Sequence, residues 1–93
     1  MTMAVEARIP TILRSYTGGE KAVSGEGATL QELFVDLDSR YEGLRGRLVS
    51  DDGSLNRFVN VYLNDEDVRF LGGAETPLSD GDVVTILPAV AGG

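Results

Sequence analysis

The sequence predicts an α+β domain in which one amphipathic helix lies across one face of a mixed β-sheet. Segments with strand-like patterns precede a helical pattern over residues 29–43, and three more strand-like segments follow it. Hairpins on both sides of one long helix are typical of this class. With 93 residues, the chain is expected to be one small domain with a single thin core.

The segment before the helix predicts a β-hairpin. Apolar and charged residues alternate over residues 5–9, as in a half-buried strand, and Pro10 suggests an edge or a bulge. The expected segments that follow are a continuing strand over residues 11–16, a turn over residues 17–20 and a returning strand over residues 21–23. The glycines at positions 25 and 27 are expected to break this second strand.

The helix carries the clearest local signal. Thr29 and Glu32 fit a capping box, in which the Thr hydroxyl accepts from an amide three residues on and the Glu carboxylate reaches back. Apolar residues then recur on one helical face, at Leu30, Leu33, Phe34, Leu37 and Tyr41. We expect Gly43 to end the helix, and Leu44 and Leu48 to lie on a short extra turn.

Three strands are expected after a loop at residues 51–54. Residues 57–63 are rich in aromatic and β-branched residues, which predicts a central strand. Residues 64–67 are expected to turn the chain into a short strand at residues 68–70. Loops then lead to the last strand, residues 83–87, whose pairing should end at Pro88 because proline has no N–H.

The composition excludes several kinds of chemistry. The chain has no Cys and no His, so it has no disulfide, no thiolate and no imidazole base or metal ligand. The 8 basic and 15 acidic residues give a net charge of −7, which argues against nucleic acid. No apolar run approaches the ~18 residues of a membrane span, and no signal peptide is expected. We expect a cytoplasmic protein that is a monomer on its own.

The acidic clusters are interpreted as solvated turns. The clusters at residues 36–38, 64–67 and 80–82 each lack part of the calcium-loop pattern of alternating oxygen ligands, a sharp-turn Gly and a late Glu. No metal or cofactor is therefore expected on this chain. Most aromatic residues are interpreted as core or sheet-face residues, and Tyr16 is expected to be exposed near a hairpin tip.

The end of the chain is the part with the most chemical content. Gly92 and Gly93 close an uncharged segment in an otherwise acidic protein. One interpretation is a frayed terminus. The other is a thin probe, because glycine lacks a Cβ and its backbone can enter a narrow catalytic channel. We expect a folded domain over residues 1–88 and a flexible tail over residues 89–93, which could reach roughly 20 Å from Pro88.

The chain resembles the ubiquitin-like sulfur carriers of thiamin and molybdopterin synthesis, the ThiS/MoaD superfamily. Within it, the chain looks most like the CysO-type carriers of actinobacterial cysteine synthesis. The resemblance lies in residues 10–19, residues 57–70 and residues 79–93. It implies a β-grasp fold, which agrees with the element order predicted above.

The resemblance also implies a carrier that serves partner enzymes rather than an enzyme. A ubiquitin-activating-type adenylyltransferase would use ATP and Mg to adenylate the Gly93 carboxylate, and a sulfur donor would leave a thiocarboxylate there. The acceptor would be a pyridoxal-phosphate cysteine synthase or a thiosugar synthase. Where a carrier–cysteine amide forms, a JAMM-type metalloprotease would release the cysteine. These cofactors would belong to the partners.

Residue roles follow from the resemblance. Gly93 would carry the sulfur, and Gly92 and Ala91 would form the thin part of the probe. Val90 and Pro88 would fix the direction in which the tail leaves the domain.

Docking is expected next to the tail. Leu87 lies where these carriers usually place an apolar docking residue, although a core position at the strand end is an equal alternative. Phe58 or Phe70 is expected to join this patch on the exposed sheet face.

Two other functions stay open from the sequence. One is protein tagging, with Gly93 joined to lysines of other proteins; Lys21 is the only lysine of this chain, so polymeric chains would have little attachment chemistry. The other is a non-covalent β-grasp binding module whose tail is incidental.

Overall fold

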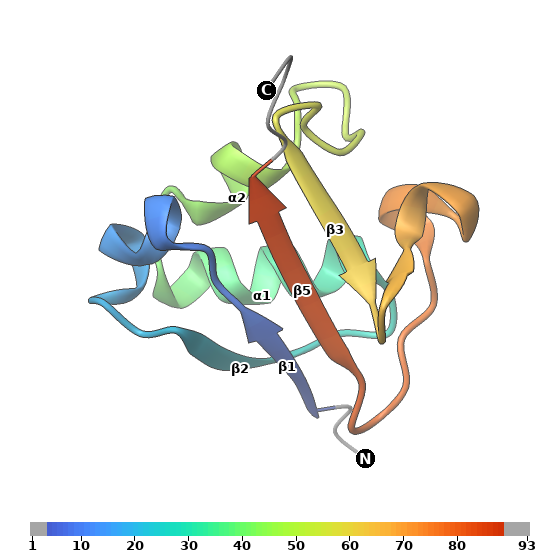
Figure 1. Ribbon diagram of the computed structural model, residues 1–93, viewed down its shortest axis with the longest axis horizontal. Coiled ribbons are helices and arrows are strands. Elements are labelled where there is room, and N and C mark those ends of the chain that lie inside the picture. Colours follow the sequence, from blue (N-terminus) through green and yellow to red (C-terminus); the bar gives the residue numbers. More distant parts are fainter. Residues whose placement is uncertain (1–3, 89–93) are drawn as a thin grey trace.

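The computed structural model describes residues 4–88 and places five strands in one mixed sheet, in the order β2-β1-β5-β3-β4. Figure 1 shows the longer helix, α1, crossing one face of this sheet. The elements are β1 (Ala4–Arg8), η1 (Thr11–Thr17), β2 (Ala22–Glu26), α1 (Leu30–Arg40), α2 (Leu44–Leu48), β3 (Val59–Leu63), β4 (Glu66–Asp67), η2 (Val68–Phe70), η3 (Gly73–Glu75) and β5 (Val83–Pro88), where η marks a 3₁₀ helix. The predicted α+β architecture is confirmed.

The β1–β2 hairpin is confirmed, but its connection differs from the prediction. Residues 11–16 are part of the 3₁₀ helix η1, not a continuing strand. Pro10 explains the change, because it cannot donate to a strand ladder and its carbonyl instead accepts from Leu13 N at 2.9 Å. Tyr16 on this helix is half-buried rather than exposed, and it packs against the core.

The expected break at Gly25 is also wrong, because β2 continues through Glu26. A Cβ atom built on Gly25 would lie 2.6 Å from Leu33 Cδ1 and 2.9 Å from Leu37 Cδ2. The glycine therefore lets α1 lie directly on the strand, a close approach that a side chain would prevent.

The capping box of α1 is confirmed with one shift. Thr29 Oγ1 accepts from Glu32 N at 3.2 Å, while the Glu32 carboxylate accepts from Ala28 N at 3.0 Å, one residue earlier than the pattern predicts. The predicted apolar face is buried, except that Tyr41 is half-buried. Gly43 does not end α1, which stops at Arg40; with φ at 92° it caps the start of α2.

The three C-terminal strands are present, but two expectations about them are wrong. The central strand is β5, which pairs parallel with β1 and antiparallel with β3. Residues 68–70 form η2, and the short strand comes two residues earlier, because Asn64 and Asp65 at φ 49° and 76° complete the turn. Pro88 is the last residue of β5 and lies opposite Val59.

Only one face of the sheet is covered. Val84 and Ile86 of β5 are buried beneath α1, whereas Leu87 on the alternate side is exposed. This alternation along the central strand leaves the second face open. No helix in residues 4–88 is long and apolar enough to cross a membrane.

Candidate partner-docking site at the end of the sheet

The central strand ends where the predicted tail begins. Pro88 lies opposite Val59, and Leu87 lies opposite Asn60. The last residues of β5 and the first residues of β3 therefore lie side by side at the same end of the sheet. Figure 1 shows this end of β5 beside the start of β3. The predicted site residues Val90, Ala91, Gly92 and Gly93, and the tail over residues 89–93, lie outside the described residues.

Leu87 is placed on the open face. Its side chain is 44% exposed, while the preceding Ile86 is 1% exposed. The structure therefore excludes the core position that the sequence left open for Leu87. An apolar side chain exposed one residue before the strand ends is available to a partner protein.

A shallow hollow lies beside Leu87 on this face. Its volume is about 230 Å³, and it is lined by Tyr62, Asp65, Thr85 and Leu87. Tyr62 lies directly opposite Thr85 in the β3–β5 pair. Sequence reasoning missed Tyr62 as a site residue, because only the strand register brings it beside Leu87.

Phe58 and Phe70 are exposed, and both lie just outside the strands of the sheet. Phe58 is 60% exposed and precedes β3, and Phe70 is 87% exposed on η2 beside the edge strand. Arg69 donates from Nη2 to the Val59 carbonyl at 3.1 Å, which holds η2 against the start of β3. Phe58 therefore lies next to the start of β3, and Phe70 lies beside the edge strand β4.

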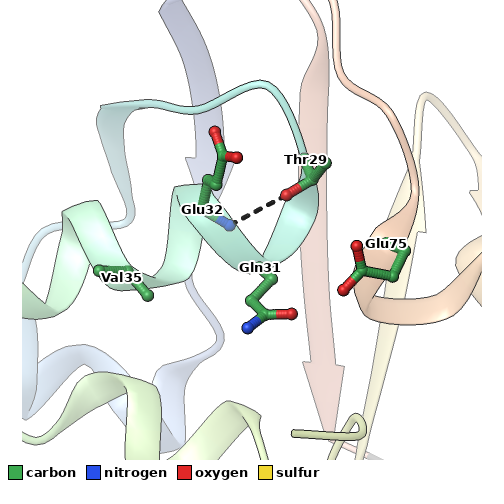
Figure 2. A pocket seen from close by; sticks show the side chains of 5 residues that line it. All are labelled: Thr29, Gln31, Glu32, Val35 and Glu75. Atoms are coloured by element: carbon green, nitrogen blue, oxygen red, sulfur yellow. Dashed lines mark hydrogen bonds between the residues drawn. The ribbon is translucent and has the colours of Figure 1, made fainter.

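The pocket in Figure 2 offers no catalytic arrangement. Its volume is about 360 Å³, and it is lined by Thr29, Gln31, Glu32, Val35 and Glu75. The Thr29 hydroxyl is already used by the helix cap, as the dashed line shows. The Glu32 carboxylate also serves the cap, because it accepts from Ala28 N at 3.0 Å, and this leaves the Gln31 amide and the Glu75 carboxylate as the remaining polar groups.

The described residues give no support to metal binding either. No group of three or more Asp, Glu, His or Cys residues within residues 4–88 could hold a metal ion.

The acidic turn at Asp52 is stabilised locally: hydrogen bonds from the Ser54 hydroxyl and backbone amide lower the pKa of the Asp52 carboxyl.

A mixed sheet with one helix across one face, an open second face and a central C-terminal strand is the β-grasp fold of ubiquitin-like proteins. The ThiS family model matches residues 7–93 of this chain. The chain therefore belongs to the ThiS family.

The similar proteins agree with this assignment. Sulfur carrier protein CysO of Mycobacterium tuberculosis is 58% identical over 93 residues, which cover 98% of this chain and 100% of that protein. The crystal structure of the Amycolatopsis orientalis BexX/CysO complex contains a chain that is 58% identical, with a TM-score of 0.89 and coverage of 96% of this chain and 99% of that one. This chain is a sulfur carrier of the CysO type.

A third relative carries a different name. Small archaeal modifier protein 3 of Haloferax volcanii is 37% identical over 94 residues, covering 98% of this chain and 100% of that protein. The β-grasp family thus includes proteins named as modifiers beside those named as sulfur carriers.

Proposed function

We propose that this carrier works through the carboxylate of Gly93. Attack of the carboxylate on the α-phosphorus of ATP gives an acyl-adenylate and releases pyrophosphate. A hydrosulfide equivalent then forms a C–S bond at the carbonyl carbon, the C–O bond to AMP breaks, and a thiocarboxylate remains. The observation that carries the proposal is the match of the ThiS family to residues 7–93, which include Gly92 and Gly93.

The residues that precede Gly93 present it to partner enzymes and take no part in the bond changes. Gly92 and Ala91 keep the probe narrow, because neither has a side chain beyond Cβ. Val90 and Pro88 set the direction from the sheet, with Pro88 limited to φ near −65°. Leu87 and the hollow beside it form the surface at which partner proteins bind the domain.

The chain acts as a co-substrate and not as a catalyst. It has no His and no Cys to serve as base or nucleophile. ATP and Mg belong to the adenylyltransferase that activates Gly93, and pyridoxal phosphate belongs to the acceptor enzyme. These reactions take place in the cytoplasm, and the carrier is a monomer between encounters.

The sulfur acceptor is a pyridoxal-phosphate cysteine synthase or a thiosugar synthase. Both are supported by the likeness to the mycobacterial CysO carrier, and the BexX/CysO complex supports direct binding between a carrier of this type and a partner protein. A JAMM-type metalloprotease completes the cysteine route by hydrolysing the carrier–cysteine amide.

Intact-mass spectrometry tests the proposal. The purified chain, its adenylyltransferase, ATP and a sulfide source should give a mass increase equal to the replacement of one oxygen by sulfur. Tandem fragmentation should place the change on Gly93, and a chain lacking Gly93 should show none. An unchanged mass in the complete mixture would contradict the proposal.

A second function is favoured by the likeness to the archaeal modifier protein. In this function the activated Gly93 forms an isopeptide bond with lysines of other proteins. Covalent adducts on added proteins, without a thiocarboxylate intermediate, would favour tagging over sulfur transfer.

A further inference from the structure

A groove separate from the open sheet face lies beside the end of β5. Its volume is about 490 Å³, and it runs between η1, α2 and the start of β3. The side chains that matter here are Ile12, Ser15, Tyr16, Arg47 and Phe58. None of the residues that line the hollow beside Leu87 takes part in this groove.

The rim of the groove is apolar and exposed. Ile12 is 64% exposed and Phe58 is 60% exposed, although both are large apolar side chains. Burying two such side chains together is a typical source of binding energy at the centre of a protein interface.

Arg47 is held in a fixed position in the groove. Its Nε donates to Tyr16 Oη at 2.6 Å, and its guanidinium carbon lies 5.7 Å from the centre of the Tyr16 ring. Nearby, the Arg57 guanidinium lies 5.3 Å from the centre of the Phe58 ring. Stacking on aromatic rings pre-orders both cations, so less side-chain entropy is lost when they bind a partner.

Within residues 4–88, Arg47 and Arg57 are free of ion pairs with carboxylates. The chain carries a net charge of −7, and the ion pairs within residues 4–88 join Arg8 to Glu6 and Arg40 to Asp36. Neither Arg47 nor Arg57 has a carboxylate within 4.0 Å among those residues. The groove therefore complements a surface that presents carboxylates around an apolar side chain.

The groove also lies close to the end of β5. Phe58 directly precedes Val59, which lies opposite Pro88. A partner that binds the residues after Pro88 can therefore also contact this rim. Adenylation is the step that every use of Gly93 requires, whether for sulfur transfer or for tagging.

We propose that the groove receives an apolar side chain, flanked by carboxylates, from the enzyme that adenylates Gly93. This inference rests on the proposed function. It adds a second contact, on the side of the molecule formed by η1 and α2, to the contact at Leu87.

Steady-state ATP–pyrophosphate exchange by the adenylyltransferase, with this chain as the varied substrate, tests the inference. Arg47→Glu and Phe58→Ser should each raise the KM for the carrier by about tenfold or more, as expected for central interface residues. Ser15→Trp, which fills the groove without removing Arg47 or Phe58, should do the same. The kcat should stay within about twofold, because the tail is unchanged.

Two matched controls lie elsewhere on the surface. Lys21→Glu makes the same charge reversal at an exposed residue, and Val35→Ser removes an apolar side chain that is 51% exposed on α1. Both should leave the KM within about twofold of the wild-type value. Circular dichroism melting of every variant separates loss of docking from loss of fold.

The outcomes distinguish the inference from the function on which it rests. If the wild type is activated and all three groove variants keep its KM, the groove inference is overturned and the proposed function stands. If the groove variants lower the KM, the groove holds the chain's own tail instead, and the inference is overturned. If the wild type is not activated at all, the proposed function fails and the inference fails with it.

Discussion

Gly25 shows how one residue sets the distance between α1 and the sheet. It lies in β2 with its backbone buried, and Leu33 and Leu37 of α1 occupy the space where its side chain would be. A glycine in a strand interior costs conformational entropy. Here that cost is offset by the closer packing of two leucines that are fully buried.

We expect Gly25→Ala to lower the free energy of unfolding by about 1–3 kcal/mol, because the added methyl overpacks the core. Gly46→Ala is the matched control: no atom lies within 4 Å of its Cβ position, and alanine in helix α2 should be neutral or stabilise by up to about 1 kcal/mol. Urea denaturation of both variants measures the difference. Equal stability of the two variants would show that α1 can move away from β2 without cost.

At the scale of the elements, the edge strand β2 is protected by side chains of α1. Ser24 O accepts from Arg40 Nη2 at 2.8 Å, and Glu26 N donates to Asp36 Oδ2 at 2.9 Å. Arg40 and Asp36 also form an ion pair at 2.9 Å. Because Ile9 N donates to Lys21 O, the alternating register turns the backbone groups of Ser24 and Glu26 away from β1. The Asp36 and Arg40 side chains thus form hydrogen bonds with backbone groups of β2 that could otherwise pair with another strand.

The double variant Asp36→Ala/Arg40→Ala should therefore self-associate through β2. Sedimentation velocity over a range of concentrations should show a dimer or larger species that the wild type does not form. The control Glu20→Ala/Lys21→Ala removes one acid and one base from exposed positions outside β2. A double variant that sediments like this control would show that the edge needs no such protection.

At the scale of the whole molecule, the residues that stabilise the fold are different from the residues proposed to bind partners. The core lies between α1 and one face of the sheet, while the groove and the exposed Leu87 border the end of β5. Neighbouring residues of one strand thus serve different purposes: Ile86 packs into the core and Leu87 faces outward. A carrier that binds partner proteins benefits from this arrangement, because docking residues can be exposed without weakening the core.

We expect Leu87→Ser to reduce loading of sulfur onto the carrier by about tenfold at limiting carrier concentration, with a change in unfolding free energy below about 1 kcal/mol. Ile86→Ala should instead lower the free energy of unfolding by about 2–5 kcal/mol. The folded fraction of this variant should be loaded with sulfur as in the wild type. Mass spectrometry of the thiocarboxylate and thermal denaturation measure the two effects. Normal loading of Leu87→Ser would remove Leu87 from the docking site.

The sequence by itself determined the features that depend on near neighbours. The Thr29–Glu32 cap, the apolar face of α1 and the alternation in β1 all follow from spacing within one segment. The class of fold follows from the order of such segments along the chain. The chemistry proposed for Gly93 also comes from the sequence, through its resemblance to the ubiquitin-like sulfur carriers.

Only the tertiary structure decided the features that join distant segments. The central place of β5, the pairing of Tyr62 with Thr85 and the groove between Tyr16, Arg47 and Phe58 depend on which strands and helices meet. The strand at Gly25 belongs here too, because this glycine makes room for Leu33 and Leu37 of α1, which lie eight and twelve residues further along the chain. Local spacing carries the period of a side-chain pattern, but strand order and register are fixed by contacts across the core.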